Sequence, residues 1–131
     1  MLVEYIYLIR EREFAYSNQP VYKLGRTNKI ATRMNSYPKD SEVYLVEAVN
    51  DSVYVEKELI TIFEEIYERA TTKNGSAFIG NEYFVGNVNE MIYIIRTYIS
   101  NHCPKALQAR GHWPKTIKIN TWVINLKQIN N

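Results

Sequence analysis

The stretch VYKLGRTNKIATRMNSYP, residues 21–38, predicts a β-strand that leads into a short basic helix. Apolar and polar residues alternate from Val21 to Gly25, as is typical of a strand. We expect the helix from about Asn28 to Tyr37, because Pro38 disfavours a helical conformation in the residue before it. Gly25 has no side chain and leaves room for a ligand or a crossing helix. The segment therefore places several cations beside a gap in the strand surface.

Strand and helix signals alternate along the rest of the chain. Segments rich in β-branched and aromatic residues predict two more strands, and N-caps followed by apolar stripes predict two more helices. Glu90, three residues after Asn87, completes the pattern of a capping box. We expect strands at Val3–Ile9 and Glu42–Val49, helices from Asp51 to about Arg69 and from Asn87 onward, a polar loop at 10–20, and a short extended or irregular segment at 77–86.

The length and the cysteine content limit the class of protein. A chain of 131 residues is expected to form one domain with a core that needs no disulfides. The single cysteine, Cys103, excludes an internal disulfide framework and fits a reducing, intracellular compartment. The sequence contains neither the pattern of a secretory leader nor a run of membrane-spanning length.

Charge is distributed unevenly along the chain. Residues 1–90 hold 10 Lys and Arg against 14 Asp and Glu, whereas residues 91–131 hold 6 Lys and Arg and no acid. This basic tail favours a polyanionic partner, nucleic acid rather than a membrane. Trp113 and Trp122 in the tail are suited to stacking on bases or to lying along a backbone groove. Two alternatives stay open: a solvated tail, and a strand, helix or dimer contact built around Trp122.

One carboxylate falls on the apolar side of the helix expected after Asp51. With about 100° per residue and Val55 at 0°, the apolar side chains lie between about −20° and 160°, and Glu56 lies at about 100°. A carboxylate that faces a core must be paired, protonated or bound to a cation. Glu56 is therefore a candidate for a structural salt bridge, a metal ligand or a catalytic acid.

The expected basic helix carries a related pair of side chains. Ile30, Met34 and Tyr37 share one face, and Arg33 flanks it, so Arg33 and Tyr37 can point to one place. The planar fork of an arginine suits a phosphate, and a tyrosine hydroxyl can donate to a phosphate or exchange a proton with water. The alternative is that Arg33 pairs with Glu56 and that Tyr37 belongs to the core.

Strand parity brings further residues to one surface. Alternation places Tyr5 and Tyr7 on one face of the first strand, and Lys23 and Gly25 on one face of the second. If these two strands pair, a tyrosine, a lysine and bare backbone can line the same surface.

The order of these motifs resembles the GIY-YIG nuclease superfamily, in particular its GIY-YIG-like branch in phages and large DNA viruses. The similarity lies in YIYLI, YKLG, an arginine eight residues after the glycine, a tyrosine four residues later, a helical glutamate and NEYF. It covers about residues 4–99, within a domain of residues 1–100, and leaves residues 101–131 as a basic C-terminal extension that can pack on the domain. The resemblance implies an α/β fold with a central three-stranded antiparallel sheet flanked by helices, and a virus-encoded protein in the host cell.

The resemblance also implies an active site. It assigns catalysis to Tyr7, Arg33 and Glu56, with Glu56 as the ligand of one Mg²⁺ or Mn²⁺ ion, and substrate binding to Lys23, Gly25, Arg26 and Tyr37. The implied reaction is hydrolysis of nucleic-acid phosphodiester bonds, with DNA favoured over RNA. In this mechanism Arg33 stabilises the charge of the transition state, and Tyr7 activates the attacking water.

The motifs depart from the family pattern at two positions. Tyr5 replaces the glycine of the first motif, and Lys23 replaces the tyrosine of the second, while the adjacent Tyr22 has the wrong parity. Lys23 can hold a phosphate as a point charge, but an ammonium group is a poor general base. Three functions therefore stay open: a metal-dependent endonuclease, a nucleic-acid-binding module that has lost turnover, and a protein-interaction domain with a tyrosine-rich surface.

Overall fold

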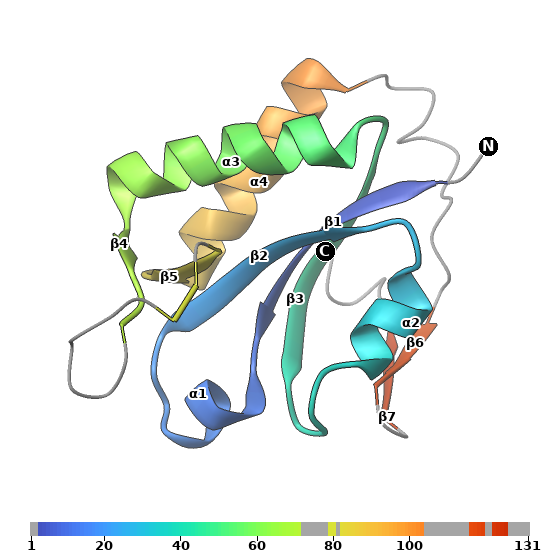
Figure 1. The fold of residues 1–131 in the computed structure, drawn as a ribbon, viewed down its shortest axis with the longest axis vertical. Helices are drawn as coiled ribbons and strands as arrows, with labels where there is room; N and C mark the ends of the chain where they lie inside the picture. The colour runs from blue at the N-terminus through green and yellow to red at the C-terminus, as the bar shows by residue number, and fades with distance from the viewer. Residues whose placement is uncertain (1–2, 72–78, 81, 104–115, 120–121, 126–131) are drawn as a thin grey trace.

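An antiparallel sheet of five strands forms the centre of the computed structural model (Figure 1). The strand order is β3-β1-β2-β5-β4, which places β2 in the middle of the sheet with β1 beside it. The structure describes residues 3–71, 79–80, 82–103, 116–119 and 122–125. The strands of the sheet are β1 (Glu4–Arg10), β2 (Val21–Thr27), β3 (Glu42–Val49), β4 (Glu68–Arg69) and β5 (Tyr83–Val85).

The α/β class is confirmed, but the expected count of three strands is wrong. The two additional strands, β4 and β5, have only two and three residues, too few for hydrophobic alternation to be recognised in the sequence. β4 exists because the preceding helix ends at Ile66 rather than near Arg69, and Tyr67 adopts an extended conformation. β5 forms because Phe84 is fully buried in the core and pairs with Tyr22 on β2.

Four helices accompany the sheet: α1 (Arg12–Tyr16), α2 (Ile30–Asn35), α3 (Ser52–Ile66) and α4 (Val88–His102). α1 lies in the segment predicted as a polar loop, and its five residues are too few to show a helical period. α2 lies within the predicted range but is shorter at both ends, since Lys29 already has a non-helical conformation.

The predicted N-caps of the two long helices are confirmed. The Asp51 carboxylate accepts from the Tyr54 N–H at 3.1 Å, and the Asn87 amide oxygen accepts from the Glu90 N–H at 3.0 Å. The Glu90 carboxylate, however, accepts from the Tyr67 hydroxyl at 2.6 Å. It therefore ties the start of α4 to the end of α3.

Alternate residues of β1 belong to two hydrophobic cores on opposite faces of the sheet. Ile6 and Leu8 contribute to the larger core with residues of α3 and α4. Tyr5 and Tyr7 contribute to the smaller core, together with residues of α2. The parity predicted for the first strand is thus confirmed, and each core is closed by a different set of helices.

The apolar stripe of α3 is buried only along its centre. Val55, Leu59 and Phe63 are buried against the sheet, as the helical spacing predicts. Val53 and Ile66, at the two ends of the helix, are 59% and 52% exposed. Val53 is exposed because it lies at the edge of the stripe, and Ile66 is exposed although it shares the buried side of the helix, because it is the last residue of α3.

Beyond α4, two strands form a separate hairpin, β6 (Thr116–Ile119) and β7 (Trp122–Asn125). β6 lies beside α2, at the opposite end of the molecule from α4 (Figure 1). Trp122 therefore begins a strand, one of the alternatives left open for the tail, and it pairs with Ile119. Trp113 lies outside the described residues.

Gly25 lies opposite Tyr7 in the β1–β2 pair, and the two residues are in close contact. A Cβ atom on Gly25 would lie 2.3 Å from Cζ of Tyr7 and 2.4 Å from its hydroxyl oxygen. Tyr7 is only 1% exposed, so its ring has little space to move away. We predict that Gly25→Ala lowers the free energy of unfolding by about 1–3 kcal/mol, measured by urea denaturation.

A double-mutant cycle controls for an unrelated cause of this loss. In a Tyr7→Val background the ring is absent, so Gly25→Ala should cost much less than in the natural chain. Equal losses in both backgrounds would contradict the steric explanation.

Candidate functional site

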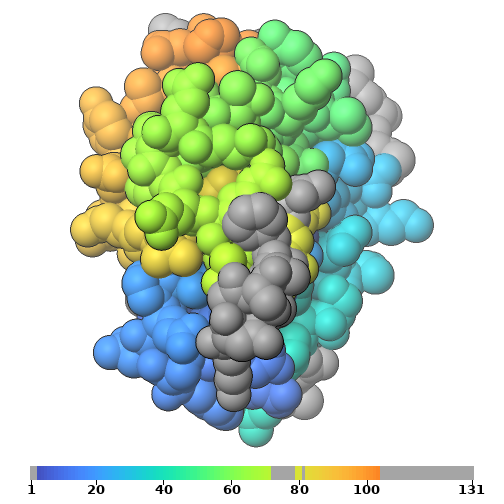
Figure 2. Space-filling view, turned by 60° about the vertical axis from the view of Figure 1, so that its left-hand side comes forward, coloured from blue at the N-terminus to red at the C-terminus, as the bar shows by residue number. Residues whose placement is uncertain are grey.

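The candidate site lies where β5 stops pairing with β2. Ladder pairing covers only Val21–Lys23 of β2, and one further bond joins the Leu24 N–H to the Glu82 carbonyl at 2.9 Å. Within the described residues, no strand pairs with Gly25–Thr27 on this edge. α3 contacts β2 here, and in the space-filling view the end of β2 and α2 lie below α3 along one edge of the molecule (Figure 2). Side chains from both faces of the sheet can therefore meet around this edge.

Two buried tyrosines occupy the α2 face of this edge. The hydroxyl oxygens of Tyr7 and Tyr37 lie 2.6 Å apart, and their rings pack edge to face with centroids 6.1 Å apart. Burial raises the pKa of both hydroxyls, most strongly that of Tyr7, whose bond to Tyr37 raises it further. The same bond lowers the pKa of Tyr37. The pair is therefore protonated at neutral pH, with Tyr37 the easier of the two to ionise.

Lys23 lies on the same face as the tyrosines, as its parity predicts. Its ammonium nitrogen is 5.1 Å from the ring centroid of Tyr37 and 5.6 Å from that of Tyr83. Such cation–π contacts hold the ammonium between the two rings. The Tyr83 hydroxyl donates to the Glu11 carboxylate at 2.5 Å, which fixes the second ring. Lys23 is thus an ordered cation.

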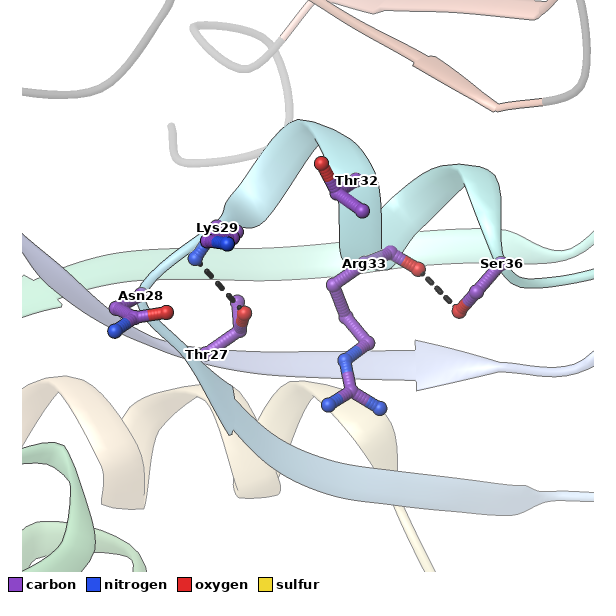
Figure 3. Close-up of a pocket in the computed structure, with 6 residues that line it drawn as sticks. All are labelled: Thr27, Asn28, Lys29, Thr32, Arg33 and Ser36. Atoms are coloured by element: carbon purple, nitrogen blue, oxygen red, sulfur yellow. Dashed lines mark hydrogen bonds between the residues drawn. The ribbon is translucent and has the colours of Figure 1, made fainter.

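Arg33 extends from α2 toward β2 (Figure 3). Its side chain is exposed, and its positive charge lowers the pKa of Tyr7, of Tyr37 and of Glu56. It forms no salt bridge with Glu56 in the part of the chain that the structure describes. The structural pairing of Arg33 with Glu56, one of the alternatives from the sequence, is therefore absent, and the guanidinium is available to an anionic ligand.

On the opposite face, a short polar chain connects β1, β2 and α3. The Nε of Arg26 donates to the Ser52 hydroxyl at 2.9 Å, and that hydroxyl donates to the Glu4 carboxylate at 2.6 Å. The Ser52 backbone N–H donates to the same carboxylate oxygen at 3.0 Å. Ser52 is completely buried, so these bonds fix the first turn of α3 against the sheet. They also set the position of Glu56, one turn further along.

Glu56 is a half-buried carboxylate among cations from three directions. Burial is the main cause that raises the pKa of Glu56, and the negative charge of Glu82 raises this pKa further. The positive charges of Arg26, Lys23 and Arg33 lower it. It has no hydrogen bond or salt bridge to another described residue. A partly buried carboxylate in this setting can offer its oxygen atoms to a cation or a proton.

Glu82 is a second carboxylate that the sequence reasoning did not assign to the site. It precedes β5, and its carbonyl accepts from Leu24, which places it opposite that residue beside the edge of β2. Its charge raises the pKa of Glu56, Tyr37 and Tyr83. The sequence offered one sign that Glu82 belongs to the site, namely its position in the NEYF segment. Its proximity to Glu56, however, depends on the pairing of β2 with β5.

The donor atoms at this edge fit a hard divalent cation. Carboxylate oxygens such as those of Glu56 and Glu82 suit Mg²⁺ or Mn²⁺, and Mg²⁺ commonly keeps several waters beside one or two carboxylates. Among the described residues, no group of three or more His, Cys, Asp or Glu side chains lies together. Water and phosphate oxygens would have to complete the coordination.

The structure brings all seven predicted site residues to the two sides of one strand edge. Tyr7, Lys23, Gly25 and Tyr37 lie on the α2 side, Arg26 and Glu56 lie on the α3 side, and Arg33 reaches the edge from α2. Their roles in binding or catalysis stay predictions.

A family model of the T5orf172 domain matches residues 4–99, about three quarters of the chain. The chain belongs to the T5orf172 domain family. This is a phage-associated domain found in nuclease contexts of the GIY-YIG-like and HNH types, and the GIY-YIG family itself is not matched directly. No curated protein and no solved structure matches the chain.

A membrane-spanning helix is absent from the described residues: none of their helices combines the length and the apolar character needed to cross a bilayer.

The raised pKa of Glu56 predicts a pH-dependent change in stability. The pKa of Glu56 is higher in the folded protein than in the unfolded chain, where it is about 4.5. Between these two pKa values only the folded protein keeps the proton, so the free energy of unfolding falls as the pH rises. Glu56→Gln removes this pH-dependent loss of stability, because glutamine does not ionise. We predict that the variant melts a few degrees higher than the natural chain at pH 7, measured by thermal unfolding.

The difference should shrink toward pH 4, where Glu56 is protonated in both states. Glu65→Gln, an exposed change on the same helix, is the matched control. A lower melting temperature for Glu56→Gln at pH 7 would show that ionised Glu56 stabilises the fold.

Proposed function

We propose that the protein is a metal-dependent endonuclease that hydrolyses phosphodiester bonds of DNA. The observation that carries the proposal is the arrangement of Lys23, Arg26 and Arg33 around the half-buried Glu56 at the open edge of β2. Cations alone would suit any anion, but a carboxylate among them repels a phosphate unless a cation lies between the two. The T5orf172 family supports a nuclease or DNA-binding role.

The cations of this edge have distinct roles in the proposed reaction. Arg33 is exposed, so its planar guanidinium can form two hydrogen bonds with the scissile phosphate and stabilise the additional charge of the transition state. Lys23, held between two aromatic rings, binds a phosphate oxygen as an ordered point charge. Arg26 is fixed by Ser52 and balances the charge of Glu56.

Glu56, with Glu82 beside it, would hold one Mg²⁺ or Mn²⁺ ion. When bound, the ion supplies Lewis-acid stabilisation of the phosphate and of the leaving oxygen. Because burial raises the pKa of Glu56, protons compete with the cation for its oxygens at mildly acidic pH.

The two tyrosines position water and phosphate. Because the pKa of Tyr7 is raised, its hydroxyl keeps its proton at neutral pH and orients the attacking water by hydrogen bonding. Its action as a general base requires prior loss of that proton, which Lys23 and Arg33 favour and burial opposes. Tyr37 lies beside it, and their shared hydrogen bond raises the pKa of Tyr7 and so favours its protonated form.

A binding module without turnover is the second candidate, and Lys23 is the observation that favours it. Lys23 occupies the position of the second-motif tyrosine, and in the structure it contacts aromatic rings on the surface where that hydroxyl would lie. A site of this kind keeps its affinity for phosphate but lacks one hydroxyl near the attacking water.

Incubation of the full chain with supercoiled plasmid and Mg²⁺ tests the proposal. We predict nicking that EDTA abolishes, that Glu56→Gln abolishes, and that Arg33→Ala slows by about 10²- to 10³-fold. Binding of duplex DNA by Glu56→Gln should persist, because the cations remain in place.

Glu65→Gln, exposed on the outer side of α3, should nick at the natural rate. Salt-sensitive binding without nicking would support the module without turnover. Absence of both binding and nicking would exclude both functions.

A further inference from the structure

A shallow groove of about 360 Å³ runs along α2, next to the candidate site. Its lining comes from the end of β2 and from one side of the helix (Figure 3), namely Thr27, Asn28, Lys29, Thr32, Arg33 and Ser36. Lys29 and Ser36 are the N-cap and C-cap of α2, and Thr32 and Arg33 lie between them, so polar side chains line the groove from one end of the helix to the other. The opposite face carries Ile30 and Met34, which are buried in the smaller core.

The chemistry of the groove is that of an anion site. Its lining includes two cations, Lys29 and Arg33, and no carboxylate. Lys29 is exposed, and its ammonium group forms no salt bridge with a described residue. Asn28 and Thr32 add an amide and a hydroxyl, both of which can donate to phosphate oxygens.

The two remaining side chains shape the wall of the groove. The Thr27 hydroxyl oxygen accepts from the Lys29 backbone N–H at 2.9 Å, which fixes the turn between β2 and α2. The Ser36 hydroxyl donates to the Arg33 carbonyl at 2.6 Å, which fixes the last turn of the helix. The side chains of Lys29, Thr32 and Arg33 are therefore presented from a defined backbone.

Arg33 connects the groove to the candidate site. It is one of the lining residues of the groove, its guanidinium extends toward β2 (Figure 3), and its charge lowers the pKa of Glu56. A ligand that reaches Arg33 at the site and continues past it enters the groove. A nucleic-acid strand presents such a repeated series of negative charges, one per about 3.4 Å of helix axis.

We propose that this groove binds a backbone phosphate of the DNA strand adjacent to the scissile phosphate, with Lys29 and Thr32 as its main contacts. The inference rests on the proposed function and extends it by a second phosphate subsite. The subsite adds affinity and sets the register of the strand, but it touches neither the metal ligands nor the attacking water.

Salt-dependent binding of a labelled duplex DNA by the full chain tests the subsite. Fluorescence anisotropy in the non-cleaving Glu56→Gln background, between about 50 and 200 mM salt, gives the affinity and the number of phosphate contacts. We expect Lys29→Gln to weaken binding about three- to tenfold and to reduce the salt slope by about one. Lys29→Arg should keep the salt slope. Thr32→Val should weaken binding but leave the salt slope unchanged.

Lys57→Gln is the matched control, because Lys57 is an exposed lysine on α3 and its replacement changes the charge equally. If Lys29→Gln and Lys57→Gln leave the affinity and slope equally unchanged while the natural chain binds and nicks DNA, the subsite is wrong and the proposed function stands. If the natural chain neither binds nor nicks DNA, both are wrong. Thermal unfolding of each variant identifies any loss of affinity that comes from loss of the fold.

Discussion

The contact between Tyr7 and Gly25 determines how the rest of the molecule is arranged around β2. The ring of Tyr7 lies across the strand surface where Gly25 has no side chain, which lets its hydroxyl reach Tyr37 at the end of α2. One residue without a Cβ thus allows a strand, its neighbour and a helix to meet at a hydrogen bond of 2.6 Å. With any larger residue at this position, the ring would shift, and the smaller core with it.

The two faces of β2 are built on different physical principles. The α2 face relies on aromatic packing and on one lysine between two rings, so its polar groups are few and ordered. The α3 face relies on a hydrogen-bonded chain through Ser52, and the carboxylate of Glu56 has no hydrogen bond or salt bridge to another described residue. Burial of a carboxylate beside a core lowers stability, and such a cost is typical of sites selected for binding rather than for folding.

Local patterns predicted a large part of this arrangement. Strand alternation placed Tyr7, Lys23 and Gly25 on one surface, and a helical projection singled out Glu56, because both patterns depend only on backbone geometry. The cap residues Asp51 and Asn87 were predicted for the same reason. The short strand β4 could not be predicted, and β5 was expected only as part of an extended or irregular segment at 77–86, since pairing with distant residues stabilises both strands. Glu82 was missed as a consequence, because only the β2–β5 pairing brings it to Glu56.

Because β5 begins only at Tyr83, opposite Lys23, the end of β2 also affects how copies of the protein interact with one another. An unpaired strand edge offers free backbone groups to any other extended chain and invites aggregation. Gly25–Thr27 forms such an edge in the described part of the sheet, but Arg26 lies within it and Lys23 precedes it, and charged residues at an edge oppose strand addition. The cations that we assign to the proposed site thus also oppose pairing of this edge with a second molecule. Removal of their charges would therefore affect solubility as well as binding.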